Sequence, residues 1–169
     1  MQSTWRRPAT RRVRGTVRQA EILGHPPAFA SEDPHRTRGR RALGIRYEHL
    51  VHQEFLERYP GYIPSLWLRF WDEDGEKFCQ PDGLLVNPWH GIISIIEVKY
   101  SHCPQAYDQL FRTYRPIIRA LFGGLYQVSC VEVVKWFDPA VLTEVAPALC
   151  KYPELAPVDR WNVHIFKPR

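Results

Sequence analysis

Three charged residues in the middle of the chain have types and a spacing that could do chemistry together. Glu97 and Lys99 lie two apart in the β-branched run 92–100, and Asp82 precedes a turn at 87–91. Residues two apart on a strand point to the same face, and the turn lets the neighbouring strand bring Asp82 beside Glu97. Buried charges are normally paired or bound to metal. Two carboxylates that leave room for water and a phosphate oxygen fit a hard divalent cation, Mg²⁺ best.

The elements that must position these residues can be read from hydrophobic periodicity. Apolar residues at three- and four-residue steps predict a helix over 42–58, ended by Pro60-Gly61, and another from Pro104 to the Gly123-Gly124 pair. Alternating segments predict a hairpin around the turn at 72–75 and a strand after the second helix, and the β-branched run at 92–100 predicts a buried central strand. The predicted strands are 62–71, 77–86, 92–100, 126–136 and an edge strand 161–166, with a short helix over 139–149.

The short motif and this order of elements resemble a known family. Pro81-Asp82 is followed, after fourteen residues, by Glu97-x-Lys99, which resembles the signature of the PD-(D/E)XK nuclease superfamily. The resemblance covers about residues 42–136. It implies an α/β restriction-endonuclease-like core, a mixed β-sheet flanked by helices in αβββαβ order. It also implies that Asp82 and Glu97 hold one or two Mg²⁺ ions, for which Mn²⁺ can substitute, while Lys99 orients the attacking water. Glu48, on the first helix, matches the glutamate that often reaches these metals.

The second predicted helix is compared with one branch of that superfamily. The RecB-type exonucleases resemble one another in a Q-x-x-x-Y motif, whereas Gln109 and Tyr114 are separated by four residues instead of three. This departure favours Tyr114 as a core residue and leaves Gln109 as a candidate phosphate contact. Arg112 and Arg115 of the same helix are further candidate nucleic-acid contacts. Cys130 and Cys150 are not clustered, which argues against the iron–sulfur cluster of some relatives.

The positive charge is concentrated at the N-terminus. The net charge is +5, but residues 1–41 hold ten arginines and three acids, a net of +7, so the remaining 128 residues carry −2. This segment is proline-rich and lacks a sustained apolar period, which predicts a flexible arm over 1–41 joined to a domain over 42–169 that does not depend on it. Arginine binds phosphate bidentately, so the arm is expected to grip a nucleic-acid backbone rather than act only as a solvated tail. The candidate contacts are Arg6, Arg7, Arg11, Arg12 and Arg14.

Other reactive side chains fit structural roles better than chemical ones. His49 and His52 do not form a metal-binding H-E-x-x-H pattern, so a solvated or hydrogen-bonded role is expected. Cys79 and Cys103 lack a recognisable partner for nucleophilic work, and all four cysteines are expected to be reduced and packed. The tryptophans Trp67, Trp71, Trp89, Trp136 and Trp161 are assigned to the core by default, with a dimer contact or base stacking as the alternatives. His102 is expected to be a loop residue, with substrate contact as the alternative.

Together these features predict a Mg²⁺-dependent nuclease that hydrolyses DNA phosphodiester bonds. A structure-specific or partner-directed endonuclease is favoured, because no zinc finger or helix-turn-helix supplies base contacts. The alternatives are a junction resolvase, a recombination-type exonuclease related to RecB, a phage or mobile-element nuclease subunit, or a non-cleaving nucleic-acid-binding or assembly protein with the same fold. A homodimer or a partner protein could supply specificity. Without a ~20-residue apolar stretch, a cytoplasmic protein with no membrane contact is expected.

Overall fold

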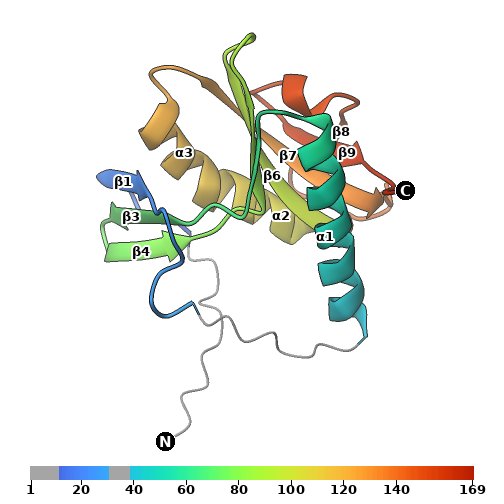
Figure 1. Cartoon of the computed structure of the whole chain (residues 1–169), viewed down its shortest axis with the longest axis horizontal. Coiled ribbons are helices and arrows are strands. Elements are labelled where there is room, and N and C mark those ends of the chain that lie inside the picture. The colour runs from blue at the N-terminus through green and yellow to red at the C-terminus, as the bar shows by residue number, and fades with distance from the viewer. Residues whose placement is uncertain (1–11, 31–38) are drawn as a thin grey trace, which may run out of the picture.

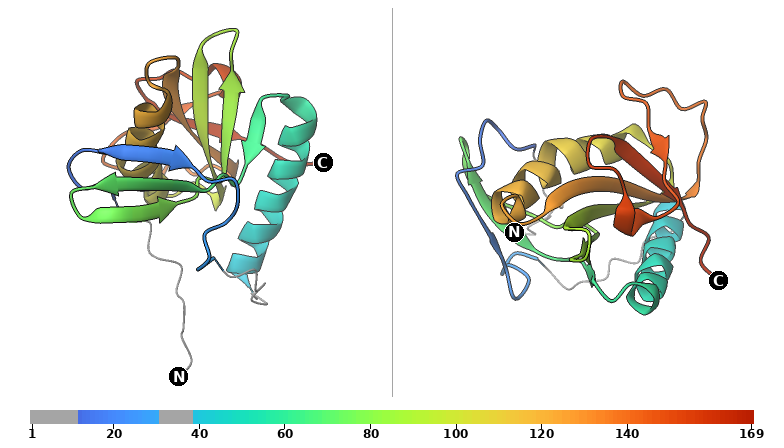
Figure 2. Two further views of the ribbon diagram at one scale, coloured as in Figure 1. Left: turned by 60° about the vertical axis from the view of Figure 1, so that its left-hand side comes forward. Right: turned by 90° about the horizontal axis from the view of Figure 1, so that it is seen from above.

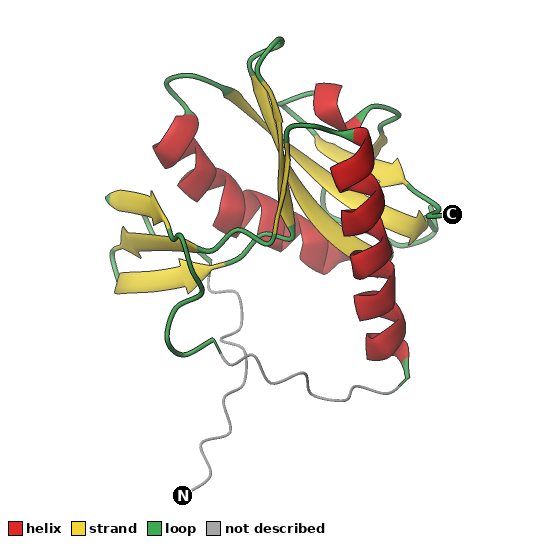
Figure 3. Ribbon diagram, in the orientation of Figure 1, coloured by secondary structure: helices red, strands yellow, loops and turns green. Residues whose placement is uncertain are grey.

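A computed structural model describes residues 12–30 and 39–169 of the chain. They form a mixed α/β structure with a six-stranded main sheet and a three-stranded side sheet (Figures 1 and 3). The main sheet has the order β2-β5-β6-β7-β9-β8, in which β2, β5 and β6 are antiparallel neighbours and β6, β7, β9 and β8 are parallel neighbours. Its strands are β2 (Tyr62–Pro64), β5 (Gly83–Asn87), β6 (Ile92–Ser101), β7 (Gln127–Trp136), β8 (Ala148–Leu149) and β9 (Trp161–Ile165).

The central strand β6 is buried on both faces, as its β-branched sequence predicts. Helix α1 (Arg40–Arg58) covers one face, where Val51 and Phe55 pack with Ile96 and Val98 of β6. The other face is covered by one continuous helical segment of three parts, which packs on the odd-numbered residues of β6 (Figure 2). These parts are α2 (Pro104–Gln109), the π-helical turn η1 (Leu110–Tyr114) and α3 (Arg115–Phe122). The two helices predicted from periodicity are therefore confirmed, with boundaries close to those expected.

The predicted hairpin over 62–86 bends in the middle and contributes to two sheets. Each of its strands is broken, so β2 and β5 join the main sheet while β3 (Leu68–Asp72) and β4 (Gly75–Cys79) form the side sheet. Pro81 has no N–H and cannot continue a ladder, and Ser65 on the opposite strand has a positive φ of 52°. The Ser65 N–H donates to the Asp82 carbonyl at 2.8 Å, which holds the two breaks side by side. Asp82 therefore lies at the bend.

Residues 12–30 are part of the fold, which corrects the expectation of a flexible arm for this segment. Strand β1 (Gln19–Ile22) is the third strand of the side sheet, paired antiparallel with β3, and contacts α3. Val13, Val17 and Ala20 pack against the main core. These three apolar residues are scattered among arginines and show no strand alternation, so the sequence gives little sign of β1, whose backbone pairs with β3. Of the rest of the expected arm, Arg40 and Arg41 begin α1, and residues 1–11 and 31–38 lie outside the described residues.

Two expectations for the C-terminal third are wrong. No helix forms over 139–149, where Pro147 and three β-branched residues disfavour one and Leu142 is 92% exposed, so no burial would stabilise it. Strand β9 is not an edge strand, because it lies between β7 and the two-residue β8. Its Trp161 and Val163 are fully buried.

Two simpler expectations can be compared directly with the structure. All four cysteines are free thiols, and burial raises the pKa of Cys130 to about 12, so it is an inert core residue. In residues 12–30 and 39–169, no helix is long and apolar enough to cross a membrane.

Candidate active site

Asp82 and Glu97 come together where the bent hairpin meets the central strand. Gly83, the first residue of β5, pairs with Ile96 of β6, so Asp82 lies one step beyond and accepts the Val98 N–H at 2.7 Å through Oδ2. Glu97 is only 2% exposed. Burial, and then the nearby charges of Glu97 and Glu48, raise the pKa of Asp82 well above its usual value. Such crowding of carboxylates is relieved either by a proton or by a cation.

Lys99 supplies positive charge to this group. Its Nζ lies 2.5 Å from Glu97 Oε1, as expected for residues two apart on one face of β6. Burial disfavours the ammonium, but the charge and hydrogen bond of Glu97 outweigh burial and raise the pKa of Lys99. Lys99 is therefore protonated near neutral pH and acts as a hydrogen-bond donor, not as a base.

Glu48 approaches the site from helix α1. His52, one turn further along, lies between Glu48 and Tyr62, with Nε2 3.5 Å from Glu48 Oε1 and Nδ1 2.7 Å from the Tyr62 hydroxyl. Burial, with the charges of Asp82 and Glu48, raises the pKa of Tyr62. The hydrogen-bonded role expected for His52 is confirmed, whereas Tyr62 was not anticipated from the sequence.

Tyr62 also explains why glycine follows Asp82. A Cβ at Gly83 would lie 2.5 Å from the Tyr62 hydroxyl, so any larger residue would displace this ring. The close approach keeps the hydroxyl beside the start of β5, where Asp82 is located. The absence of a side chain at Gly83 therefore lets Tyr62, which contacts His52 of α1, lie against the hairpin bend.

The helical segment on the other face contributes Gln109 and Tyr114. The Tyr114 hydroxyl donates to the Gln80 carbonyl at 3.2 Å, and the Gln109 side chain lies close enough to lower the pKa of Tyr114. Burial, followed by the charges of Glu97 and Asp82, raises the pKa of Tyr114 well above its usual value. Residues five apart would not pair so directly on an α-helix, but the π turn η1 spans Leu110–Tyr114 and accommodates the extra residue. The spacing that argued against a Q-x-x-x-Y arrangement is thus offset by local helix geometry.

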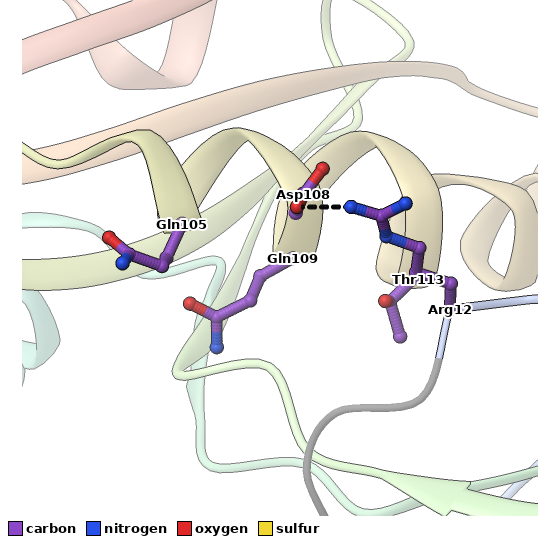
Figure 4. Close-up of a pocket in the computed structure, with 5 residues that line it drawn as sticks. All are labelled: Arg12, Gln105, Asp108, Gln109 and Thr113. Atoms are coloured by element: carbon purple, nitrogen blue, oxygen red, sulfur yellow. Dashed lines mark hydrogen bonds and ion pairs between the residues drawn. The ribbon is translucent and has the colours of Figure 1, made fainter.

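A pocket of about 330 Å³ lies beside Gln109 (Figure 4). The side chains of Gln105 and Gln109 point to the same side of the helix, and Arg12 closes one end through an ion pair of 2.7 Å with Asp108. Thr113 completes the lining. This volume is at the lower end of ligand pockets, so it suits a group the size of one nucleotide. Gln105 and Thr113 carried no motif that could have singled them out from the sequence.

The arginines predicted to contact nucleic acid are mostly engaged within the protein. Arg14 lies 3.2 Å from Asp74, and Arg112 lies 3.3 Å from Asp108. Arg115 donates to the Val158 carbonyl at 3.0 Å and is half-buried, so it holds the segment before β9. Arg12 lines the pocket and faces solvent with more than half of its side chain. Arg6, Arg7 and Arg11 lie outside the described residues.

A buried pair supports the site from behind. Glu132 of β7 is aligned with Glu97 on the neighbouring strand, and its Oε2 lies 2.7 Å from His102 Nδ1. Its Oε1 accepts the Cys103 N–H at 3.0 Å, which fixes the start of α2. Burial raises the pKa of Glu132 to about 8 and lowers that of His102. His102 is 5% exposed and paired, which fits a structural role.

The oxygen ligands present match a hard cation in chemistry. Asp82 and Glu97, with Glu48 nearby, are carboxylates of the kind that Mg²⁺ prefers, and their crowding would be relieved by positive charge. Among residues 12–30 and 39–169, however, no three His, Cys, Asp or Glu side chains are grouped closely enough to form a ready metal site. A bound ion would therefore be held by two carboxylates together with water and substrate oxygens, the arrangement typical of Mg²⁺.

Comparisons with known proteins give no family for this chain. No protein-family model, no curated protein and no solved structure matches it. The function must therefore be argued from the site itself.

Proposed function

We propose that this chain is a Mg²⁺-dependent nuclease of the PD-(D/E)XK type that hydrolyses DNA phosphodiester bonds. The observation that carries the proposal is the meeting of the buried Glu97 with the partly buried Asp82 and Lys99 at the hairpin bend. The order of α1, the strands through β6, the α2–α3 segment and β7 supports a restriction-endonuclease-like core. A domain serving only to bind would have no evident use for carboxylates crowded against a lysine.

Each residue has a role that follows from its surroundings. Asp82 and Glu97 would hold the metal, with Glu48 adding negative charge nearby, and the metal would supply charge neutralisation at the phosphate and a more acidic bound water. Lys99, protonated and held at the edge of the site, would orient the attacking water or donate to a phosphate oxygen. Val98 fixes the Asp82 carboxylate through its N–H, so that one oxygen remains for a ligand.

The choice between endonuclease and exonuclease depends on a second observation. The pairing of Gln109 with Tyr114 across the π turn favours the RecB-related alternative more than the sequence spacing did. A structure-specific or partner-directed endonuclease remains the main proposal. The small polar pocket beside Gln109 offers no extended surface for reading a sequence, which favours recognition of DNA structure over sequence. Covalently closed circular DNA separates the two, because it has no end at which an exonuclease could begin.

The proposal is tested with Asp82→Asn and Glu97→Gln, which keep side-chain shape but remove the charge. We expect both variants to fold and to lose cleavage of supercoiled, linear, flapped and four-way DNA in Mg²⁺. Asp159→Asn, at an exposed carboxylate paired with the neighbouring Arg160, is the matched control and should cut at the wild-type rate. Wild-type cleavage in either site variant, or no Mg²⁺-dependent cleavage of any substrate by the unmodified chain, would contradict the proposal. Binding without cleavage would favour the non-cleaving alternative.

A further inference from the structure

Trp136 is an exposed aromatic residue at the same end of the sheet as Lys99. It is the last residue of β7 and is aligned with Ser101 of β6, while Lys99 is aligned with Val134. Two residues along a strand correspond to about 7 Å. The indole is 50% exposed, although the sequence assigned the tryptophans to the core by default. A large apolar ring is thus left open to solvent within a short distance of the candidate site.

Two lysines surround this ring. Lys167 Nζ lies 4.9 Å from the centre of the Trp136 ring, and Lys135 Nζ lies 5.8 Å from it and 5.4 Å from the Tyr100 ring. Within the part of the chain that the structure describes, neither lysine forms an ion pair with a carboxylate, whereas Arg12, Arg14 and Arg58 each do. The nearby Asp138 is occupied by the Ala140 N–H, which donates to it at 2.9 Å. Among residues 12–30 and 39–169, the positive charge around Trp136 therefore has no carboxylate paired with it.

An exposed indole between two such cations matches the chemistry of an unpaired nucleotide. A base stacks on the ring, and the phosphates on either side of it meet the ammonium groups; duplex DNA does not expose a base face for this purpose. An apolar protein partner would cover the ring but leave both lysines without an anion. The charge around the ring thus selects a nucleic-acid strand over a protein.

We propose that Trp136, Lys135 and Lys167 form a stacking platform for single-stranded nucleic acid next to the candidate active site. The role of this platform rests on the proposed function. It would hold the unpaired strand of a flap, branch or end while the neighbouring phosphate lies at Asp82 and Glu97. It deepens that function by naming the substrate class, a substrate with unpaired bases. Its existence as a binding surface can be measured without any cleavage.

The chain offers a matched control for the test. Trp89 is 93% exposed and lies in the turn between β5 and β6, at the opposite end of β6 from Lys99. Binding of a fluorescein-labelled single-stranded oligonucleotide, and of the duplex of the same sequence, is measured by anisotropy in EDTA with the full chain. Trp136→Ala should weaken single-strand binding about 5- to 150-fold, the range expected for losing one base stack. Duplex binding should change less than about twofold, and Trp89→Ala should bind like the unmodified protein.

Two further variants separate stacking from charge. Trp136→Phe should recover most of the single-strand affinity, because it keeps an aromatic face. Lys135→Gln with Lys167→Gln should flatten the salt dependence of log affinity by about 1.4, since each phosphate contact to a single strand contributes about 0.7. Unchanged single-strand binding in Trp136→Ala, an equal loss for duplex, or an equal loss in Trp89→Ala would overturn the proposal.

Failure of this proposal is distinguishable from failure of the nuclease. If Trp136-dependent binding is found but no substrate is cut in Mg²⁺, the nuclease assignment fails and the platform stands. If cleavage depends on Asp82 and Glu97 but single-strand affinity does not depend on Trp136, the platform fails and the nuclease stands.

Discussion

Gln109 and Tyr114 are five residues apart, yet their side chains make a polar contact, because the helix between them makes a π turn. The turn adds one residue without changing which face of the helix meets the sheet, so Leu110 and Tyr114 both remain buried. Tyr114 is therefore presented to the carboxylates Asp82 and Glu97, whose charges add to burial in raising its pKa. The first prediction concerns this turn.

Deleting Arg112 should convert the π turn to ordinary α-helix and keep Gln109 next to Tyr114. Arg112 is the residue of choice because its side chain is on the surface, whereas Phe111 stacks on Tyr107 with ring centres 4.6 Å apart. We expect the deletion variant to fold by circular dichroism and to retain cleavage within about tenfold. Inserting an alanine after Arg112 is the control, because it rotates Tyr114 by about 100° relative to Gln109. This insertion should abolish activity; equal activity in the two variants would show that the pairing has no role.

Lys99 is predicted to act as a positioned donor. Lys99→Ala should lower the cleavage rate by about 10²- to 10⁴-fold, the usual cost of losing a positioning or proton-transfer group. In the unmodified protein Lys99 lies 2.5 Å from Glu97 and competes with Mg²⁺ for this carboxylate. The Mg²⁺ concentration that gives the half-maximal rate should therefore stay the same or fall in Lys99→Ala. Rates measured over a Mg²⁺ titration give both quantities.

The arginine variant tests the geometry of the same residue. Lys99→Arg should not restore activity, since the planar guanidinium is bulkier and cannot occupy the place of a compact ammonium. Full activity in Lys99→Arg would reduce Lys99 to a simple phosphate-binding charge.

The features that the sequence predicted correctly are those that depend on residues close together in the chain. Helix α1 and the α2–α3 segment carry long apolar stripes, and β6 is a run of β-branched residues, so their existence is set by local pattern. The spacing of Glu97 and Lys99 on one strand predicted their shared face for the same reason. Asp82 was expected near Glu97 because antiparallel neighbours joined by a short turn have a narrow range of registers.

The features that were not predicted depend on distant partners. Alternation continues through both strands of the hairpin, so nothing local indicates that Ser65 and Asp82 break it together and divide it between two sheets. Strand β1 is formed because β3 offers an edge and α3 a surface, neither of which is visible from residues 19–22. A π turn likewise has no recognised sequence signal. Here it became visible only in the structure, where Leu110 and Tyr114 at its two ends are both buried.

The third prediction concerns the N-terminal segment. A truncation that begins at residue 31 removes β1 together with Val13, Val17 and Ala20, and exposes the edge of β3. Losing this burial should lower the free energy of unfolding by about 2–4 kcal/mol, which is about 4–16 °C in melting temperature for a chain of this size. Calorimetry of the truncated and full chains measures it. A truncation that begins at Arg12 is the control and should melt within about 2 °C of the full chain; equal melting of all three would return residues 12–30 to the role of a dispensable arm.

The last prediction uses the raised pKa of Glu132. Its pKa is about 8 in the folded protein and has an ordinary value of 4.5, so between these values the native state binds more protons than the unfolded state. Stability must then fall as pH rises through this window, by up to about 1.4 kcal/mol per pH unit for one proton. The lowered pKa of His102 has the opposite sign, but it acts mainly below its ordinary value of 6.5. The raised pKa of Asp82 has the same sign as that of Glu132.

The window from pH 6.5 to 8 therefore isolates the two carboxyl groups from His102. In metal-free buffer, the free energy of unfolding of the unmodified chain, measured by urea titration, should decrease over this interval. Glu132→Gln, which cannot lose a proton, should show a shallower decrease, because its amide offers one acceptor for the Cys103 N–H and one donor, as the protonated carboxyl group does. Glu144→Gln, at a carboxylate that is 89% exposed, should keep the slope of the unmodified chain. If the slope of Glu132→Gln equals that of the unmodified chain, Glu132 is already ionised in the folded protein, and the buried pair with His102 is an ion pair near neutral pH.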